Sequence, residues 1–148
     1  MPETVLVTGA SGFLGRHVAL EWAQAGHRVL GIGRAAWGEP EWRAWGLAGW
    51  LSSDLTVEAL TGFAGRPAVV AHCAGAGSVG FSFQHPAVDF QSTVGTLVPV
   101  LDYLRLRSPE SRLIYPSSAA VYGEAECQPI SEEAPLRPAS PYGAHKAM

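Results

Sequence analysis

A tyrosine and a lysine near the end of the sequence have a spacing suited to proton transfer. Tyr142 and Lys146 are four residues apart, so in a helix they would be neighbours on one face. A phenol is a poor base at neutral pH, but a nearby ammonium group stabilises the phenolate and lowers the pKa. Tyr142 would then accept a proton from a hydroxyl group. The alternative is that the pair only forms the polar surface of an amphipathic helix.

A serine that could assist this transfer follows an apolar segment. We expect residues 112–117 to form a parallel strand, and Ser118 comes directly after it. Ligands of open parallel sheets bind beyond the carboxyl ends of the strands. Ser118 would therefore hydrogen-bond the oxygen from which Tyr142 takes its proton. Serines that only cap a loop are the alternative.

Three glycines lie where the first predicted strand, residues 4–8, gives way to a helix predicted over residues 12–25. Gly9 would allow a tight turn, Gly12 would let a diphosphate approach backbone N–H groups, and Gly15 would let the helix pack on the strand. An ordinary tight turn is the alternative, but the position after the first strand favours dinucleotide binding. The residues predicted to contact the cofactor here are Gly9, Ser11, Gly12, Phe13, Leu14 and Gly15.

The second predicted strand, residues 28–33, ends without the carboxylate that usually binds the adenosine ribose of NAD. Arg34 follows it and could hold the 2′-phosphate of NADP through two hydrogen bonds, with a solvated loop arginine as the alternative. The predicted cofactor is therefore NAD or NADP. After the third predicted strand, residues 49–52, Asp54 and Leu55 would contact the adenine. Asp54 could instead be the N-cap of the next helix.

Small residues follow the fourth predicted strand, residues 68–74. Ala74 and Gly75 would let the ribose or nicotinamide of the cofactor lie against the backbone. His72 precedes them in an apolar run, which is more typical of a core histidine with a hydrogen-bond partner than of a catalyst.

The elements that must position these residues alternate between strands and helices. This alternation predicts an α/β fold with a doubly wound parallel sheet, Rossmann-like, in a single domain of residues 1–148. Pro99 predicts a kink in the fourth helix, because it lacks a backbone N–H. An exposed loop is expected over residues 123–141, with a last helix starting at Pro141 or Tyr142. The helices predicted between the strands are residues 12–25, 41–46, 57–63 and 86–107.

Composition excludes several classes of protein. A net charge of -3 offers no broad attraction to nucleic acid or to an anionic membrane surface. No apolar run approaches the roughly 20 residues of a membrane span, so we expect a cytoplasmic location. Cys73 and Cys127 are too few for a disulfide framework and lack metal-binding spacing, so no metal site is expected.

The ordered set of motifs resembles the extended short-chain dehydrogenase/reductase family, in its NAD-dependent epimerase/dehydratase branch. The resemblance covers essentially the whole chain and implies that Ser118, Tyr142 and Lys146 form the catalytic group, with Lys146 also binding the nicotinamide ribose. The segments after His72 and around Ser118 are most similar to members that act on nucleotide sugars. The family also pairs two helices in a dimer interface, which suggests a homodimer. The motifs are the glycine turn, Asp54-Leu55, residues 72–75, Gly95-Thr96, residues 117–123 and Tyr142-x-x-x-Lys146.

The sequence departs from the family at several positions. Ser92 stands where an asparagine is usual, and Gly33 replaces the usual ribose-binding acid. Ala119 and Ala120 stand where dehydratases of the family place an acid, which argues against water elimination. Family members also continue well beyond the Tyr142 helix, whereas this chain stops two residues after Lys146, so we expect that it lacks the substrate-binding region.

The function predicted from these observations is that of an NAD(P)-dependent nucleotide-sugar epimerase, which removes a hydride from a sugar carbon and returns it. The chain could be an inactive fragment of such an enzyme. One alternative is an NAD(P)-dependent reductase or dehydrogenase of another alcohol or ketone. The other is a dinucleotide-binding module without catalysis.

Overall fold

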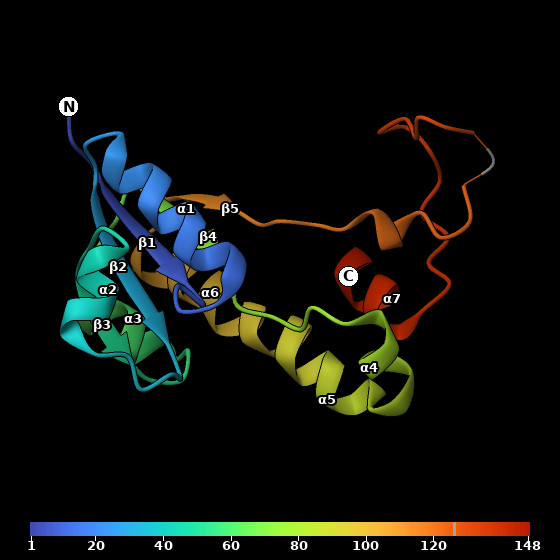
Figure 1. Ribbon diagram of the computed structural model, residues 1–148, viewed down its shortest axis with the longest axis horizontal. Helices are drawn as coiled ribbons and strands as arrows, with labels where there is room; N and C mark the ends of the chain where they lie inside the picture. The colour runs from blue at the N-terminus through green and yellow to red at the C-terminus, as the bar shows by residue number, and fades with distance from the viewer. Residues whose placement is uncertain (126) are drawn as a thin grey trace. The chain divides into compact units, whose positions relative to one another are not determined.

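The computed structural model describes residues 1–125 and 127–148 (Figure 1). The chain divides into two compact units. The first consists of Met1–Ala74 with Leu97–Tyr115, and the second of Gly75–Thr96 with Pro116–Met148. The first unit contains the sheet, and the second contains the predicted catalytic residues.

A parallel sheet forms the centre of the first unit. Its spatial order is β3-β2-β1-β4-β5, and every neighbouring pair is parallel. The chain therefore adds β2 and β3 on one side of β1 and then crosses to add β4 and β5 on the other, which confirms the doubly wound fold. This reversal of strand order next to β1 is where such folds bind their ligands. The strands are β1 (Thr4–Thr8), β2 (Arg28–Gly33), β3 (Leu47–Ser52), β4 (Val69–His72) and β5 (Arg112–Ile114).

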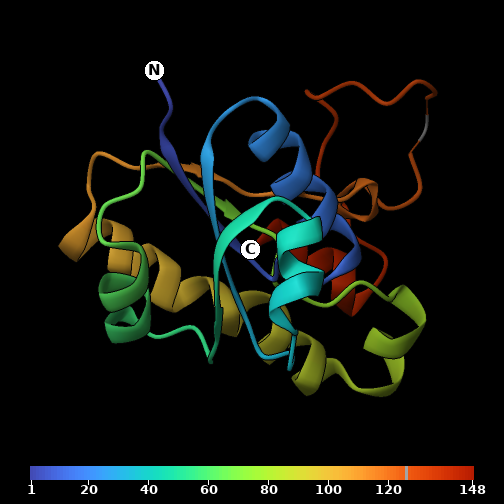
Figure 2. The same cartoon turned by 60° about the vertical axis from the view of Figure 1, so that its left-hand side comes forward.

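Helices cover both faces of this sheet because its central strands are apolar on both sides. Val5 and Val7 of β1 pack in one core with residues of α1 (Phe13–Gln24) and α2 (Glu39–Ala44). Leu6 packs in a second core with α3 (Val57–Ala64) and α6 (Thr96–Arg107). Figure 2 shows the sheet between these pairs of helices. Successive residues of a strand point to opposite faces, so a continuous apolar strand fits this arrangement.

The second unit consists of short helical elements and a long loop. Serines cap two of its helices: Ser78 Oγ accepts from the Phe81 N–H at 3.2 Å, and Ser140 Oγ accepts from the Gly143 N–H at 3.0 Å. Such caps satisfy N–H groups that have no partner within the helix. The elements are α4 (Val79–Gln84), α5 (Pro86–Phe90), a π-helical turn (Gln91–Gly95), a 3₁₀ turn (Ala119–Val121) and α7 (Pro141–Ala147).

Several predicted boundaries were wrong. The last strand ends at Ile114 instead of residue 117, in keeping with Pro116, which has no N–H to extend a ladder. Helix α4 was not predicted, although Ser78 before a partly apolar segment is a typical helix start. Thr56, and not Asp54, caps α3, because its Oγ1 accepts from the Ala59 N–H at 3.1 Å.

The long helix predicted over residues 86–107 is instead divided into α5, the π-helical turn and α6. Pro99 lies inside α6 and cannot donate to the carbonyl four residues earlier, at Gly95, which is the last residue of the π-helical turn. The irregularity thus lies just before the proline. Among the described residues, none of the helices combines the length and the apolar character that crossing a bilayer requires.

Candidate cofactor and catalytic sites

The glycine turn of the first unit lies against the backbone that follows β4. Gly9 has a φ of +65°, and a Cβ added to it would stand 2.7 Å from the Cα and N atoms of Ala74. Its N–H donates to the Ile32 carbonyl at 2.8 Å, and its carbonyl accepts from the Gly12 N–H at 2.9 Å. Only glycine fits this conformation and this space. The structure therefore places Gly9 and Ala74, two predicted cofactor contacts, next to each other.

Helix α1 packs directly onto the same turn. A Cβ at Gly15 would stand 2.8 Å from the Cα of Ala10 and would also meet the Gly9 carbonyl. The Arg16 guanidinium donates to the carbonyl of Ser11 at 2.6 Å and to that of Gly12 at 3.2 Å. The turn is thus held through its carbonyl groups and has no side chains at its glycine positions. Such a cradle fits a diphosphate at the positive end of a helix dipole.

Two further predicted contacts begin α1. Phe13 and Leu14 are its first residues, and they are 83% and 46% exposed. Their backbone N–H groups belong to the first turn, which has no acceptors within the helix. The backbone N–H groups of Phe13 and Leu14 are therefore among the donors that could bind an anion at the turn.

A tryptophan fills the space beside the glycine that ends β2. A Cβ at Gly33 would stand 3.0 Å from Cη2 of Trp50 and 3.7 Å from Oγ of Ser11. The Trp50 ring meets that of Trp37 edge-on, with 5.1 Å between the centroids. A side chain at this position would be in tight contact with the Trp50 ring, which would have to give way slightly. The Trp50 ring thus lies beside Gly33, where the ribose-binding acid would otherwise stand. Arg34, the next residue, is exposed.

Asp54 and Leu55, the two residues predicted to contact the adenine, come after β3. Asp54 is exposed, whereas Leu55 is half-buried and packs against the core formed with α3 and α6.

His72, at the end of β4, is 1% exposed, and its Nδ1 lies 2.8 Å from Oγ1 of Thr8. Thr8 Oγ1 also accepts from the Ala74 N–H at 3.3 Å. These contacts agree with the interpretation of His72 as a core histidine.

In the second unit, helix α7 carries Tyr142 and Lys146 one turn apart, as their spacing predicts, and both are half-buried. The Lys146 ammonium donates to the Pro116 carbonyl at 3.2 Å. It also lies 3.9 Å from where a Cβ of Gly75 would stand. The structure thus brings Lys146 next to Gly75, a predicted cofactor contact.

The predicted catalytic serine belongs to a turn that packs on α7. Ser118 Oγ accepts from the Ala120 N–H at 3.2 Å and so caps the 3₁₀ turn. This bond uses a lone pair of the oxygen and leaves the hydroxyl hydrogen available to a ligand. The Gly143 backbone lies so close to the Ala120 carbonyl that a Cβ there would collide with it. The turn with Ser118 and the helix with Tyr142 are therefore in direct contact.

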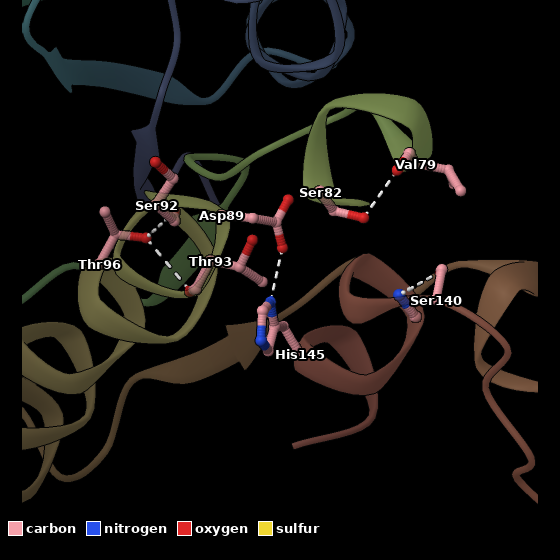
Figure 3. Close-up of polar contacts among 9 residues, drawn as sticks. Val79, Ser82, Asp89, Ser92, Thr93, Thr96, Ser140 and His145 are labelled. Carbon is pink, nitrogen blue, oxygen red and sulfur yellow. Dashed lines mark hydrogen bonds and ion pairs between the residues drawn. The ribbon is translucent and has the colours of Figure 1, made fainter. Parts of the chain in front are cut away.

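One polar pair in this unit was not predicted from the sequence. His145 of α7 and Asp89 of α5 meet through Nδ1 and Oδ2 at 2.6 Å, with side chains 12% and 0% exposed (Figure 3). The two residues are 56 positions apart, so no local spacing pattern connects them. The available signal was an acid within an otherwise apolar helix start, residues 86–90.

Comparisons with known proteins agree with this architecture. The model of the NAD dependent epimerase/dehydratase family matches residues 5–148. The UDP-glucose 4-epimerase of Streptomyces lividans is 35% identical over 152 residues, which cover 99% of this chain and 45% of that protein. Eight of the curated relatives, this one included, are matched over less than half of their own length.

Solved structures of epimerases share the fold. The structure of UDP-glucose 4-epimerase from Brucella ovis in complex with NAD has a TM-score of 0.84 and 32% identity, covering 97% of this chain and 44% of that one. The structure of UDP-glucose 4-epimerase from Bifidobacterium longum in complex with NAD+ and UDP has a TM-score of 0.84 and 29% identity, covering 97% and 46%.

Proposed function

Because the chain belongs to the NAD dependent epimerase/dehydratase family, we propose that it forms the cofactor-binding part of a nucleotide-sugar epimerase. The observation that carries this proposal is the contact between the Ser118 turn and α7, with Tyr142 and Lys146 one turn apart. Relatives with solved structures that bind NAD and UDP support this choice of ligands. The chain spans less than half of the curated relatives, so activity is proposed for the protein of which it forms a part.

The cofactor proposed is NAD, with NADP as the alternative because Arg34 follows β2. The glycine turn and the first N–H groups of α1 would hold the diphosphate, and Asp54 and Leu55 would contact the adenine. Ala74 and Gly75 would leave room for the ribose or the nicotinamide. When bound, the nicotinamide can accept a hydride from a sugar carbon and return it.

The chain's own residues would manage the proton. Tyr142 would take the proton from the sugar hydroxyl and give it back at the end of the cycle. The Lys146 ammonium would stabilise the phenolate and donate to the nicotinamide ribose. Ser118 would donate its hydroxyl hydrogen to the reacting sugar oxygen. Ala119 and Ala120 cannot transfer a proton, which favours epimerisation over dehydration.

The test measures cofactor binding and turnover separately. Isothermal titration of the chain with NAD+ and NADP+ gives the affinities, and conversion of UDP-galactose to UDP-glucose gives the turnover. We expect Tyr142→Phe to lower any turnover by at least about 100-fold, the scale of general acid–base catalysis, and to leave the NAD+ affinity within a few-fold. Tyr122→Phe, a half-buried tyrosine of the same unit outside α7, is the matched control and should change neither value.

Full turnover in Tyr142→Phe would overturn the assignment of the proton acceptor. Net release of reduced cofactor, measured by absorbance at about 340 nm, would indicate a dehydrogenase. Because turnover is proposed for the longer protein, cofactor binding without turnover by this chain agrees with the proposal, whereas the same result for the longer protein would favour a dinucleotide-binding module.

A further inference from the structure

A buried acid–histidine pair connects two helices of the second unit. Asp89 of α5 is fully buried, and its Oδ2 lies 2.6 Å from Nδ1 of His145, whose side chain is 12% exposed. The Phe90 ring meets the His145 ring edge-on, with 5.4 Å between the centroids. Figure 3 shows the pair between the helices, with Ser82 and Thr93 nearby.

Removing only one residue of this pair is expected to be destabilising. Removing a carboxylate from water is unfavourable, and the bond to His145 offsets this cost. The other carboxylate oxygen, Oδ1, is buried without a hydrogen-bond partner among the described residues, and so is Oγ1 of Thr93. Among the residues that the structure describes, His145 is therefore the hydrogen-bond partner of the Asp89 carboxylate. Loss of the imidazole would leave a buried carboxylate without compensation.

Helix α7 depends on such contacts for its position. It has only seven residues, and helices this short are not stable without tertiary packing. Ser140 fixes its first turn, whereas His145 and Lys146 are bound in its last turn. Tyr142 precedes His145 by three residues and so lies on a neighbouring part of the helix surface. Holding His145 therefore fixes the rotation of α7 about its axis and with it the direction of the Tyr142 side chain.

We propose that Asp89 and His145 are positioning residues, which hold α7 so that Tyr142 and Lys146 keep the orientation that proton transfer needs. This inference rests on the proposed function, because it takes Tyr142 as the proton acceptor. The positioning itself can be measured without cofactor or substrate. Failure of the positioning role is therefore distinguishable from failure of the proposed function.

The experiment uses the whole chain with its tyrosines labelled with ¹³C at Cζ, so that each phenol gives its own NMR signal, together with hydrogen exchange of the α7 amides by mass spectrometry. In Asp89→Asn we expect the Tyr142 signal to move while that of Tyr103, in the first unit, stays in place. We also expect the amides of residues 142–147 to exchange at least tenfold faster. The matched control is Asp102→Asn, which breaks the exposed pair of Asp102 and Arg105 on α6 and should change neither readout.

A second variant covers the case in which Asp89→Asn does not fold. Asp89→Leu combined with His145→Leu replaces the pair by apolar side chains, a change that often preserves or raises stability. A folded double variant whose Tyr142 signal has moved supports the positioning role. A Tyr142 signal and an α7 exchange rate that both stay native in either folded variant would overturn it. If the original chain does not bind NAD+, this result would instead count against the proposed function.

Discussion

Replacing Gly15 by alanine tests whether the close packing of α1 on the glycine turn limits this site. The added methyl group would stand 2.8 Å from the Cα of Ala10 and would meet the Gly9 carbonyl, and both are backbone atoms that cannot rotate away. Overpacking of this kind costs about 1–3 kcal/mol. The helix propensity of alanine offsets up to about 1 kcal/mol of this cost.

Gly62→Ala in α3 isolates the steric part of this effect. Gly62 is also a helical glycine, but a Cβ there meets nothing within 4 Å. It therefore gains the propensity of alanine without the collision, and we expect it to be as stable as the original chain or slightly more stable. The free energies of unfolding of the two variants should differ by about 1–3 kcal/mol. For a chain of this size, that is a difference in Tm of roughly 3–9 °C.

Thermal unfolding followed by circular dichroism gives the Tm, and titration with NAD+ gives the affinity. We expect Gly15→Ala to lower both, because the turn must move away from α1, and Gly62→Ala to leave the affinity unchanged. Equal Tm values for the two variants would show that the turn adapts to a side chain at residue 15. In that case the packing argument for this glycine would be wrong.

Three further predictions concern other parts of the chain. Gly33→Asp should shift the preference toward NAD+ over NADP+ at least tenfold in paired titrations, since a carboxylate can bind the adenosine ribose and repels a 2′-phosphate; an unchanged ratio beside a Gly33→Ala control would contradict this. Burial raises the pKa of Tyr103 above 10.0, partly opposed by its hydrogen bond with Ser108, so the unfolded chain loses this proton first. The contribution of Tyr103 to the free energy of unfolding is full below about pH 10 and is lost as the pH rises above that value. Tyr103→Phe, which also removes the 2.7 Å bond to the Gly65 carbonyl, should therefore show a smaller fall in the free energy of unfolding at alkaline pH, measured by urea unfolding. An identical pH dependence in the variant and the original chain would refute the assignment. Ser140→Ala should destabilise α7 by about 1 kcal/mol and speed exchange of its amides, whereas Thr56→Ala, which removes the equivalent cap of α3 in the first unit, should leave α7 unaffected; equal exchange rates in the two variants would contradict this.

The sequence predicted best those elements whose causes lie close together in the chain. The bounds of β1 and β2 agree with the prediction, because continuous apolar segments end at glycines in both places. Gly15 was predicted to let the helix pack on the strand, and the structure shows it packed against Gly9 and Ala10, directly after β1. Family membership followed from the order of several motifs.

Features that depend on distant residues could not be predicted in this way. The Trp50 ring beside Gly33 belongs to another strand, so the missing acid gave no indication of what fills its place. The partner of His145 is 56 residues away in the sequence, and no spacing pattern predicts it. Pro99 predicted a kink in the fourth helix, but the sequence did not indicate that the helix would be interrupted by a π-helical turn at Gln91–Gly95.

Each of the two units holds its predicted site residues through contacts of its own. Gly9 is fixed by Ile32 and Ala74, which belong to the first unit, as Gly9 does. Helix α7 is fixed by Asp89, Pro116 and Ala120, all in the second unit. A substitution that loosens α7 should therefore reduce proton transfer while leaving the binding of a diphosphate at the glycine turn largely intact. A substitution at the turn should do the reverse, so paired variants of the two units can separate cofactor affinity from chemistry.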